Sequence, residues 1–221
     1  MSYMDTRTQV ETYFDRTATH TWARLTSDAP VSKIRQTVRE GRDAMRALML
    51  SRLPADLTGA RVLDAGCGAG QMTRELAARG AEVVAADISP QLLSIAEKRL
   101  PTRLRDHVSF VTGDMLDEVL GRFDYAIAMD SLIYYARADL QAALERLSAR
   151  TERRVVFTVP PRTPFLMAFY MAGKLFPRSD RSPRMVPQDH RALNKGVAAE
   201  IAHVGRVSRG FYISECLEIP R

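Results

Sequence analysis

Residues 62–70 read V-L-D-A-G-C-G-A-G: a short apolar stretch, then an aspartate, then glycines on alternate positions. This pattern predicts a buried β-strand ending at Asp64, followed by a tight turn in which no side chain holds the backbone away from a ligand. A dinucleotide-binding turn has its third glycine five residues after the first. Counted from Gly66, that position is occupied by Gln71, so the spacing disfavours an NAD-dependent oxidoreductase.

Three more apolar stretches are each followed by an aspartate. They are 81–86 with Asp87, 107–112 with Asp114, and 123–129 with Asp130. Asp87 lies 21 residues after Gly66, the separation at which a carboxylate accepts hydrogen bonds from ribose hydroxyls. Open α/β sheets bind ligands at the carboxyl ends of their strands. The sequence therefore predicts a nucleoside site formed by the glycine turn and these acidic strand ends.

The same alternation runs through most of the chain. Expected strands at 61–65, 82–87, 107–112, 123–129 and 154–159 alternate with expected helices at 70–79, 90–100 and 138–149. This order predicts an α/β fold with a doubly wound, mostly parallel, Rossmann-like sheet. Apolar residues at helical spacing, including a stripe from Ile34 to Met49, predict N-terminal helices. The end of the chain predicts a hairpin of 201–207 and 211–219 around a turn at 208–210.

Composition limits the class of protein. The 221 residues are 46% hydrophobic and 26% charged, as expected for one globular domain with an elaboration. No stretch approaches the roughly 20 apolar residues that span a bilayer, and the first ten residues are too polar for a secretory signal. Two cysteines, Cys67 and Cys216, make a disulfide framework improbable, so a reducing cytoplasm is expected. Four scattered histidines predict no metal site.

Residues 160–195 interrupt the regular pattern. They hold seven basic and two acidic residues, which is +5 of a net charge of +6. Within them, residues 165–176 read F-L-M-A-F-Y-M-A-G-K-L-F, and a helix apolar on every face is either buried or presented to an apolar ligand. The neighbouring prolines and arginines favour a lid, inserted after the fifth strand, over a hydrophobic anion. The candidate contacts to that ligand are Arg162, Phe165, Phe169 and Arg178.

The glycine turn resembles that of the class I S-adenosylmethionine-dependent methyltransferases, which have no pyrophosphate to bind. The resemblance implies S-adenosylmethionine as the cofactor and assigns the strand-end residues to its parts. It places Asp64, Gly66, Cys67, Gly68 and Gly70 at the methionine side, Asp87 and Ile88 at the ribose and one adenine face, Asp114 and Met115 at the adenine edge, and Met129 and Asp130 at the methionine amine.

The turn after the fourth strand narrows the choice of acceptor. Methyltransferases that act on amide or nucleobase nitrogens commonly have an Asn/Asp-Pro-Pro-aromatic turn there, whereas residues 129–135 read M-D-S-L-I-Y-Y. A carboxylate is the simplest remaining acceptor, because its pKa near ~4 leaves it ionised at pH 7 without a general base. Its charge and the sulfonium charge cancel as the methyl group moves, so a dry pocket favours the reaction.

Longer stretches resemble the magnesium-protoporphyrin IX methyltransferase family. They are Y-F-D-R-T-A at 13–18, T-W-A-R-L-T-S-D-A-P-V-S-K-I-R at 21–35, V-R-E-G-R-D-A-M at 38–45, D-S-L-I-Y-Y at 130–135 and V-P-P-R-T-P at 159–164. This resemblance covers essentially the whole chain. It implies an enzyme that transfers a methyl group from S-adenosylmethionine to a ring propionate of magnesium protoporphyrin, on the pathway to bacteriochlorophyll.

The family resemblance carries further expectations. Residues 1–57 are expected to form a helical cap, and residues 58–221 a methyltransferase domain that includes the lid at 160–195. Tyr134 is the candidate catalytic residue beside the acceptor. Tyr13 and the helix through Arg39 and Arg42 are expected to close over the site. Expected partners are magnesium chelatase and, peripherally, the inner or photosynthetic membrane, from a cytoplasmic location and with no nucleic acid.

Other functions remain open on sequence alone. The fold also suits a non-catalytic nucleoside-binding protein, which would bind S-adenosylmethionine without turnover. An RNA methyltransferase would fit the basic charge and would bind RNA with a steep salt dependence. A quinone or other small-molecule O- or C-methyltransferase is distinguishable only by its substrate.

Overall fold

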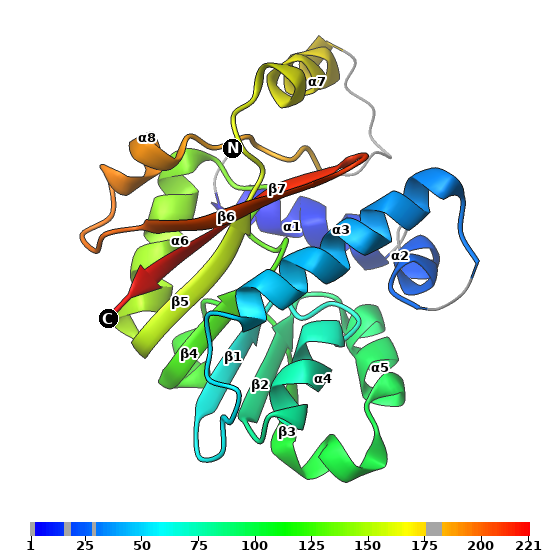
Figure 1. Ribbon diagram of the computed structural model, residues 1–221, viewed down its shortest axis with the longest axis vertical. Coiled ribbons are helices and arrows are strands. Elements are labelled where there is room, and N and C mark those ends of the chain that lie inside the picture. The colour runs from blue at the N-terminus through cyan, green and yellow to red at the C-terminus, as the bar shows by residue number, and fades with distance from the viewer. Residues whose placement is uncertain (1–2, 16–18, 28–29, 176–182) are drawn as a thin grey trace.

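The computed structural model describes residues 3–15, 19–27, 30–175 and 183–221, without the side chains of residues 20, 21, 169 and 172–175 (Figure 1). Its helices are α1 (Tyr3–Tyr13), α2 (Thr19–Leu25), α3 (Lys33–Leu50), α4 (Gln71–Ala78), α5 (Pro90–Arg99), α6 (Arg137–Ala149), α7 (Pro164–Leu175) and α8 (His190–Asn194), with 3₁₀ turns η2 (Thr102–His107) and η3 (Glu118–Leu120). Its strands are β1 (Arg61–Ala65), β2 (Glu82–Asp87), β3 (Val108–Thr112), β4 (Phe123–Ala128), β5 (Thr151–Val159), β6 (Ala202–Arg209) and β7 (Tyr212–Pro220).

The described strands form one sheet in the order β3-β2-β1-β4-β5-β7-β6. The first five strands are parallel, and β7 runs antiparallel to both β5 and β6. The strand order reverses direction between β1 and β4, which are neighbours in the sheet. In doubly wound folds such a reversal leaves a crevice at the carboxyl ends of the two strands, where ligands bind. The predicted parallel sheet and its antiparallel terminal hairpin are confirmed.

Side-chain alternation along the strands divides the core into two layers. Leu63 and Phe157 face the layer covered by α6, whereas Val62 and Val156 face the layer covered by α3, α4 and α5. Successive strand residues point to opposite faces of a sheet, so strands buried on both faces are apolar throughout. Figure 1 shows α3 crossing the sheet on the same side as α4 and α5. The result is a three-layer α/β/α sandwich, the class I methyltransferase fold.

Two details of the expected elements are wrong. Residues 208 and 209 belong to β6, and the hairpin turns through Gly210 and Phe211, with Gly210 in a left-handed conformation at φ 55°. A two-residue turn with positive φ at its first position matches the twist of the strands it joins. Ile34 is 57% exposed rather than part of the core, because the buried face of α3 begins only at Gly41.

Helix α7 stands apart from the sheet, at the top of Figure 1. Phe165 and Met171 on this helix are 51% and 53% exposed, so the apolar segment is not a core helix of this domain. Among the described residues, no helix has the length and apolar character needed to cross a bilayer. Two expected acceptor contacts cannot be located, because Arg178 and the side chain of Phe169 lie outside the described part of the chain.

Candidate functional site

The turn after β1 depends on glycines with positive φ. Gly66, Gly68 and Gly70 have φ of 79°, 54° and 78°, values that L side chains adopt only with strain. A Cβ on Gly66 would lie 2.3 Å from the Cβ of Ser131, so that glycine allows close approach of the turn after β4. The backbone N–H groups of Gly66 and Cys67 donate to the carbonyl of Ala86, at 2.8 and 3.1 Å. The turn is thereby fixed against the end of β2.

Two buried carboxylates hold this turn from below. Asp87 accepts hydrogen bonds from the backbone N–H of Gly68 at 2.8 Å and of Ser89 at 2.9 Å. Asp64 accepts one from the Thr73 hydroxyl at 2.6 Å. Burial raises the pKa of Asp64 to about 7 and that of Asp87 to about 6, despite these hydrogen bonds. Both acids therefore lie in a poorly solvated environment that a cationic ligand would stabilise.

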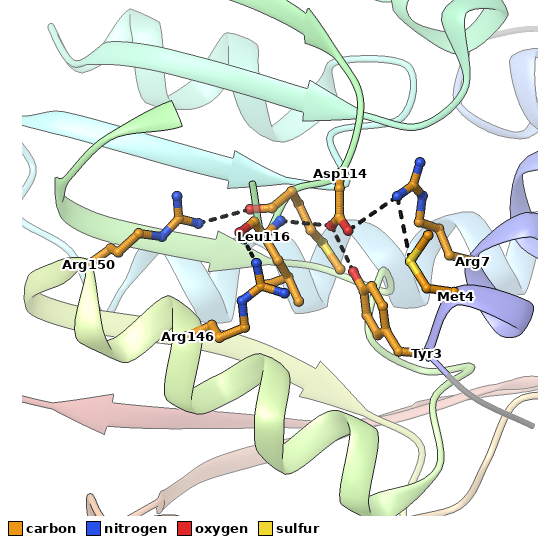
Figure 2. Close-up of polar contacts among 8 residues, drawn as sticks. Tyr3, Met4, Arg7, Asp114, Leu116, Arg146 and Arg150 are labelled. Carbon is orange, nitrogen blue, oxygen red and sulfur yellow. Dashed lines mark hydrogen bonds and ion pairs between the residues drawn. The ribbon is translucent and has the colours of Figure 1, made fainter. Parts of the chain in front are cut away.

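Asp114, after β3, is contacted by the N-terminal helix (Figure 2). The Tyr3 hydroxyl donates to Asp114 Oδ1 at 2.8 Å, and Arg7 Nη1 lies 3.4 Å from Oδ2. The Tyr3 ring stacks on that of Tyr135 with centroids 4.7 Å apart. On the other side of the turn, Arg146 and Arg150 on α6 donate to backbone carbonyls. Helix α1 therefore closes one end of the site.

Asp130, after β4, is the centre of a second network. Its φ is 56°, a left-handed value unusual for a residue other than glycine. Oδ2 pairs with Nη1 of Arg42 on α3, and Oδ1 accepts from the Tyr212 hydroxyl at 3.1 Å and from the Thr158 hydroxyl at 3.1 Å. Burial and the Asp130 charge raise the pKa of Tyr212 above its usual value. The Arg42 guanidinium also lies over the Trp22 ring, 4.6 Å from its centroid.

These groups surround a cavity of about 900 Å³. It brings together ten of the eleven residues that the sequence analysis assigned to the cofactor, all except Gly70. Gly70 instead is the N-cap of α4, where an added Cβ would lie 2.8 Å from the Cβ of Ala96. The cavity is also lined by residues that sequence reasoning did not assign to it, notably Tyr3, Phe14, Trp22, Arg46 and Tyr135.

A second cavity, of about 1,320 Å³, adjoins the first. Both cavities are lined by Trp22, Arg42, Asp130 and Tyr134. The second is otherwise mostly apolar and aromatic, with one further cation. Its remaining lining includes Val38, Ile133, Leu166, Tyr170, Arg184, Met185, Phe211 and Tyr212. A ligand in each cavity would meet the other beside these four shared side chains.

The residues expected at the acceptor are only partly brought together. Tyr134 lies at the junction, and burial raises the pKa of its hydroxyl above the usual value. Tyr13 lines neither cavity; its ring packs edge-on against Phe14, with centroids 5.2 Å apart. Arg162 and Phe165 are exposed and also lie outside the two linings. Lid residues that sequence reasoning did not name, Leu166, Tyr170 and Arg184, line the second cavity instead.

Comparison with known proteins bears on both cavities. A family model described as the magnesium-protoporphyrin IX methyltransferase C-terminus matches residues 128–221, and a methyltransferase-domain model matches residues 62–153. Over 217 residues the chain is 62% identical to the magnesium-protoporphyrin O-methyltransferase of Rhodobacter capsulatus, covering 98% of this chain and 97% of that protein. Over 225 residues it is 30% identical to the Synechocystis protein of the same name, covering 99% and 97%.

A solved structure shows the same architecture. The crystal structure of magnesium protoporphyrin IX methyltransferase from Synechocystis PCC 6803, with bound SAH (S-adenosylhomocysteine), superimposes with a TM-score of 0.81 at 29% identity. The match covers 97% of this chain and 99% of that one. It therefore includes the N-terminal helices and the segment between β5 and β6 as well as the central sheet.

Proposed function

Since this chain belongs to the magnesium-protoporphyrin IX methyltransferase family, we propose that it esterifies a propionate of magnesium protoporphyrin IX with the methyl group of S-adenosylmethionine. It is then a carboxyl O-methyltransferase of (bacterio)chlorophyll biosynthesis. The observation that carries this proposal is the junction of a cofactor-sized cavity with a larger aromatic one at Trp22, Arg42, Asp130 and Tyr134.

We assign the smaller cavity to the cofactor. Each carboxylate oxygen of Asp87 accepts one backbone N–H, and each has a second lone pair available for a ribose hydroxyl. Asp114 and the stacked rings of Tyr3 and Tyr135 flank the place for the adenine. The acids lining the cavity suit the positive charge of the sulfonium and amine. These contacts support S-adenosylmethionine binding with its methyl group toward the second cavity.

The chemical step requires positioning more than acid–base help. A propionate oxygen attacks the methyl carbon, the carbon–sulfur bond breaks with its electron pair moving to sulfur, and the products are the methyl ester and S-adenosylhomocysteine. The acceptor is already ionised at neutral pH. The raised pKa of Tyr134 keeps its hydroxyl protonated, which suits a hydrogen-bond donor and not a base. Catalysis would come mainly from holding oxygen, carbon and sulfur in line in a site from which water is excluded.

We assign the larger cavity to the porphyrin. Its rings and methionine suit a large flat apolar ligand, and Arg184 supplies a cation for a carboxylate. Residues 1–57 would act as a cap through α1, α2 and α3, and residues 160–195 as a lid through Leu166, Tyr170 and Arg184. Phe165, Phe169, Arg162 and Arg178 would then contact the porphyrin only after movement of that lid.

The test is methyl transfer with the purified protein. Labelled S-adenosylmethionine and magnesium protoporphyrin IX should give a labelled monomethyl ester, detected by mass spectrometry, together with S-adenosylhomocysteine. The magnesium complex of protoporphyrin dimethyl ester, which has no carboxylate, should accept no label. Binding of S-adenosylhomocysteine without turnover would indicate a non-catalytic protein. Labelling of a quinone in place of the porphyrin would indicate the alternative small-molecule methyltransferase.

We further propose that the mouth of the acceptor cavity meets the membrane surface and magnesium chelatase. The side chains of Phe165, Met171, Met185 and Phe211 are each at least 50% exposed, an arrangement that favours contact with an apolar surface. Chelatase would deliver its product at the same mouth, which keeps an apolar porphyrin out of water. Flotation with anionic vesicles should weaken in a Phe165→Ser, Met171→Ser variant. Pull-down of purified chelatase subunits tests the second contact, and no retention in either assay would contradict the proposal.

A further inference from the structure

Two arginines on α3 have buried hydrogen-bond donors without a partner among the described residues. They are the Nε–H of Arg42 and one Nη1–H group of Arg46. The two side chains are 13% and 14% exposed. Residues four apart in a helix lie on the same face, so both guanidinium groups project from one side of α3. A buried charged donor that lacks an acceptor is costly, and such groups in native structures call for a missing ligand.

Both arginines already have one partner that fixes their direction. Nη1 of Arg42 pairs with Asp130, and Nη2 of Arg46 lies 2.6 Å from Oδ1 of Asp43. Stacking on Trp22 further restrains Arg42. The unpaired donors are thus held by neighbouring contacts in a defined orientation, which lowers the entropy cost of binding an anion.

Charge within the cofactor cavity is unevenly distributed. In the part of the chain that the structure describes, the cations lining it are Arg42 and Arg46, both from α3. Its carboxylates lie at the ends of β1, β2, β3 and β4, and each accepts hydrogen bonds from the protein. The cavity therefore offers acceptors along the strand ends and unpaired cationic donors on the side of α3.

S-adenosylmethionine has one anionic group, the α-carboxylate of its methionyl part. We propose that Arg46, with the Nε–H of Arg42 beside it, binds this carboxylate. A guanidinium and a carboxylate match in geometry and form strong charge-assisted hydrogen bonds. The inference rests on the proposed cofactor orientation, in which the adenine lies at the opposite end, beside Asp114.

The acceptor carboxylate is the competing ligand. Arg42 lines both cavities, but Arg46 lines only the cofactor cavity. Arg184, on the far wall, is the cation that the second cavity has for itself. Arg46 is therefore placed to read the amino-acid part of the cofactor and not the porphyrin.

The test compares two ligands that differ only in the amino-acid part. Calorimetry would measure S-adenosylhomocysteine, which has the carboxylate, and 5′-methylthioadenosine, which lacks it, on the wild-type chain and on Arg46→Met. We expect the variant to bind S-adenosylhomocysteine roughly 10- to 100-fold more weakly, the range for loss of a charge-assisted hydrogen bond. Affinity for 5′-methylthioadenosine should stay within about threefold of wild type, which also shows that the site is folded.

Arg35→Met is the matched control, because it removes the same charge from an exposed position of α3. It should leave both affinities within about threefold of wild type. Equal effects of Arg46→Met on the two ligands, or none on either, would overturn the assignment. A higher KM for magnesium protoporphyrin with unchanged S-adenosylhomocysteine binding would also overturn it, in favour of the acceptor carboxylate. Failure of the wild-type chain to bind S-adenosylhomocysteine would instead contradict the proposed function.

Discussion

Arg42 on α3 forms an ion pair with Asp130 at the end of β4, 88 residues further along the chain. The two side chains are 13% and 8% exposed, so the pair is largely shielded from solvent and from salt. It lies where the two cavities meet. The pair thus fixes an N-terminal helix against the catalytic edge of the sheet.

Replacing Asp130 should separate the effect of its charge from that of its backbone. Asp130→Asn removes the charge and leaves Arg42 without its counter-ion, which should lower the free energy of unfolding by about 3 kcal/mol. Asn tolerates positive φ, whereas Asp130→Ala adds a strain of about 1 kcal/mol. Urea denaturation of the two variants measures both. Equal stability of Asp130→Asn and wild type would show that the pair contributes nothing.

The glycine turn offers a comparison of steric clash with backbone strain. Gly66 and Gly59 both have φ near +78°, at 79° and 78°, but an added Cβ meets Ser131 at 2.3 Å only at Gly66 and meets nothing within 4 Å at Gly59. Gly59→Ala should cost about 1 kcal/mol of unfolding free energy, and Gly66→Ala at least about 3 kcal/mol because overpacking is added. Thermal or urea unfolding measures the difference. Similar losses at the two positions would mean that the turn yields freely.

Asp87 should be needed for the cofactor more than for the fold. Asp87→Ala removes the acceptor proposed for the ribose hydroxyls, and we expect the affinity for S-adenosylhomocysteine to fall by roughly 100-fold, as for two lost hydrogen bonds. Glu82→Gln, at the exposed start of the same strand, is the matched control and should bind as wild type does. Calorimetry measures both. Unchanged binding by Asp87→Ala would refute the ribose assignment.

Asp64 should make stability depend on pH. Burial raises its pKa to about 7 in the folded chain, so the folded state retains a proton that the unfolded chain releases near ~4. The stabilisation is complete below the unfolded pKa and is lost as pH rises through the folded pKa. Asp64→Asn keeps an acceptor for Thr73 but cannot ionise. Between pH 5 and 8 its unfolding free energy should gain on wild type by on the order of a few kcal/mol, and a constant difference would contradict this.

Tyr134 should act without transferring a proton. Tyr134→Phe removes the hydroxyl and keeps the ring, so we expect kcat to fall by less than about tenfold, below the range of roughly 10² to 10⁴ typical of general acid–base catalysis. The pH dependence of kcat should be unchanged. Steady-state assays across pH measure both, and a loss beyond about 100-fold would assign proton transfer to this hydroxyl.

Local patterns in the sequence were enough for the sheet and for most of the cofactor cavity. The glycine spacing and the aspartates after successive strands placed ten residues around one cavity, because parallel strands bring their carboxyl ends to one edge regardless of loop detail. The turn of the terminal hairpin was placed one residue early, since Gly210 alone does not reveal which neighbour completes a two-residue turn. Gly70 resembled a ligand-contacting glycine but packs on Ala96.

The sequence by itself determined the α/β sandwich and its nucleoside-binding edge, because strand periodicity and glycine conformation act over a few residues. Only the tertiary structure decided which side chains from the N-terminal helices and from residues 160–195 reach that edge. Tyr3 meets Asp114 across 111 residues, and Arg42 meets Asp130 across 88. Helical periodicity shows that a helix has a buried face but not what it is buried against, so the contacts that join the two cavities depend on how α1, α3 and α7 dock.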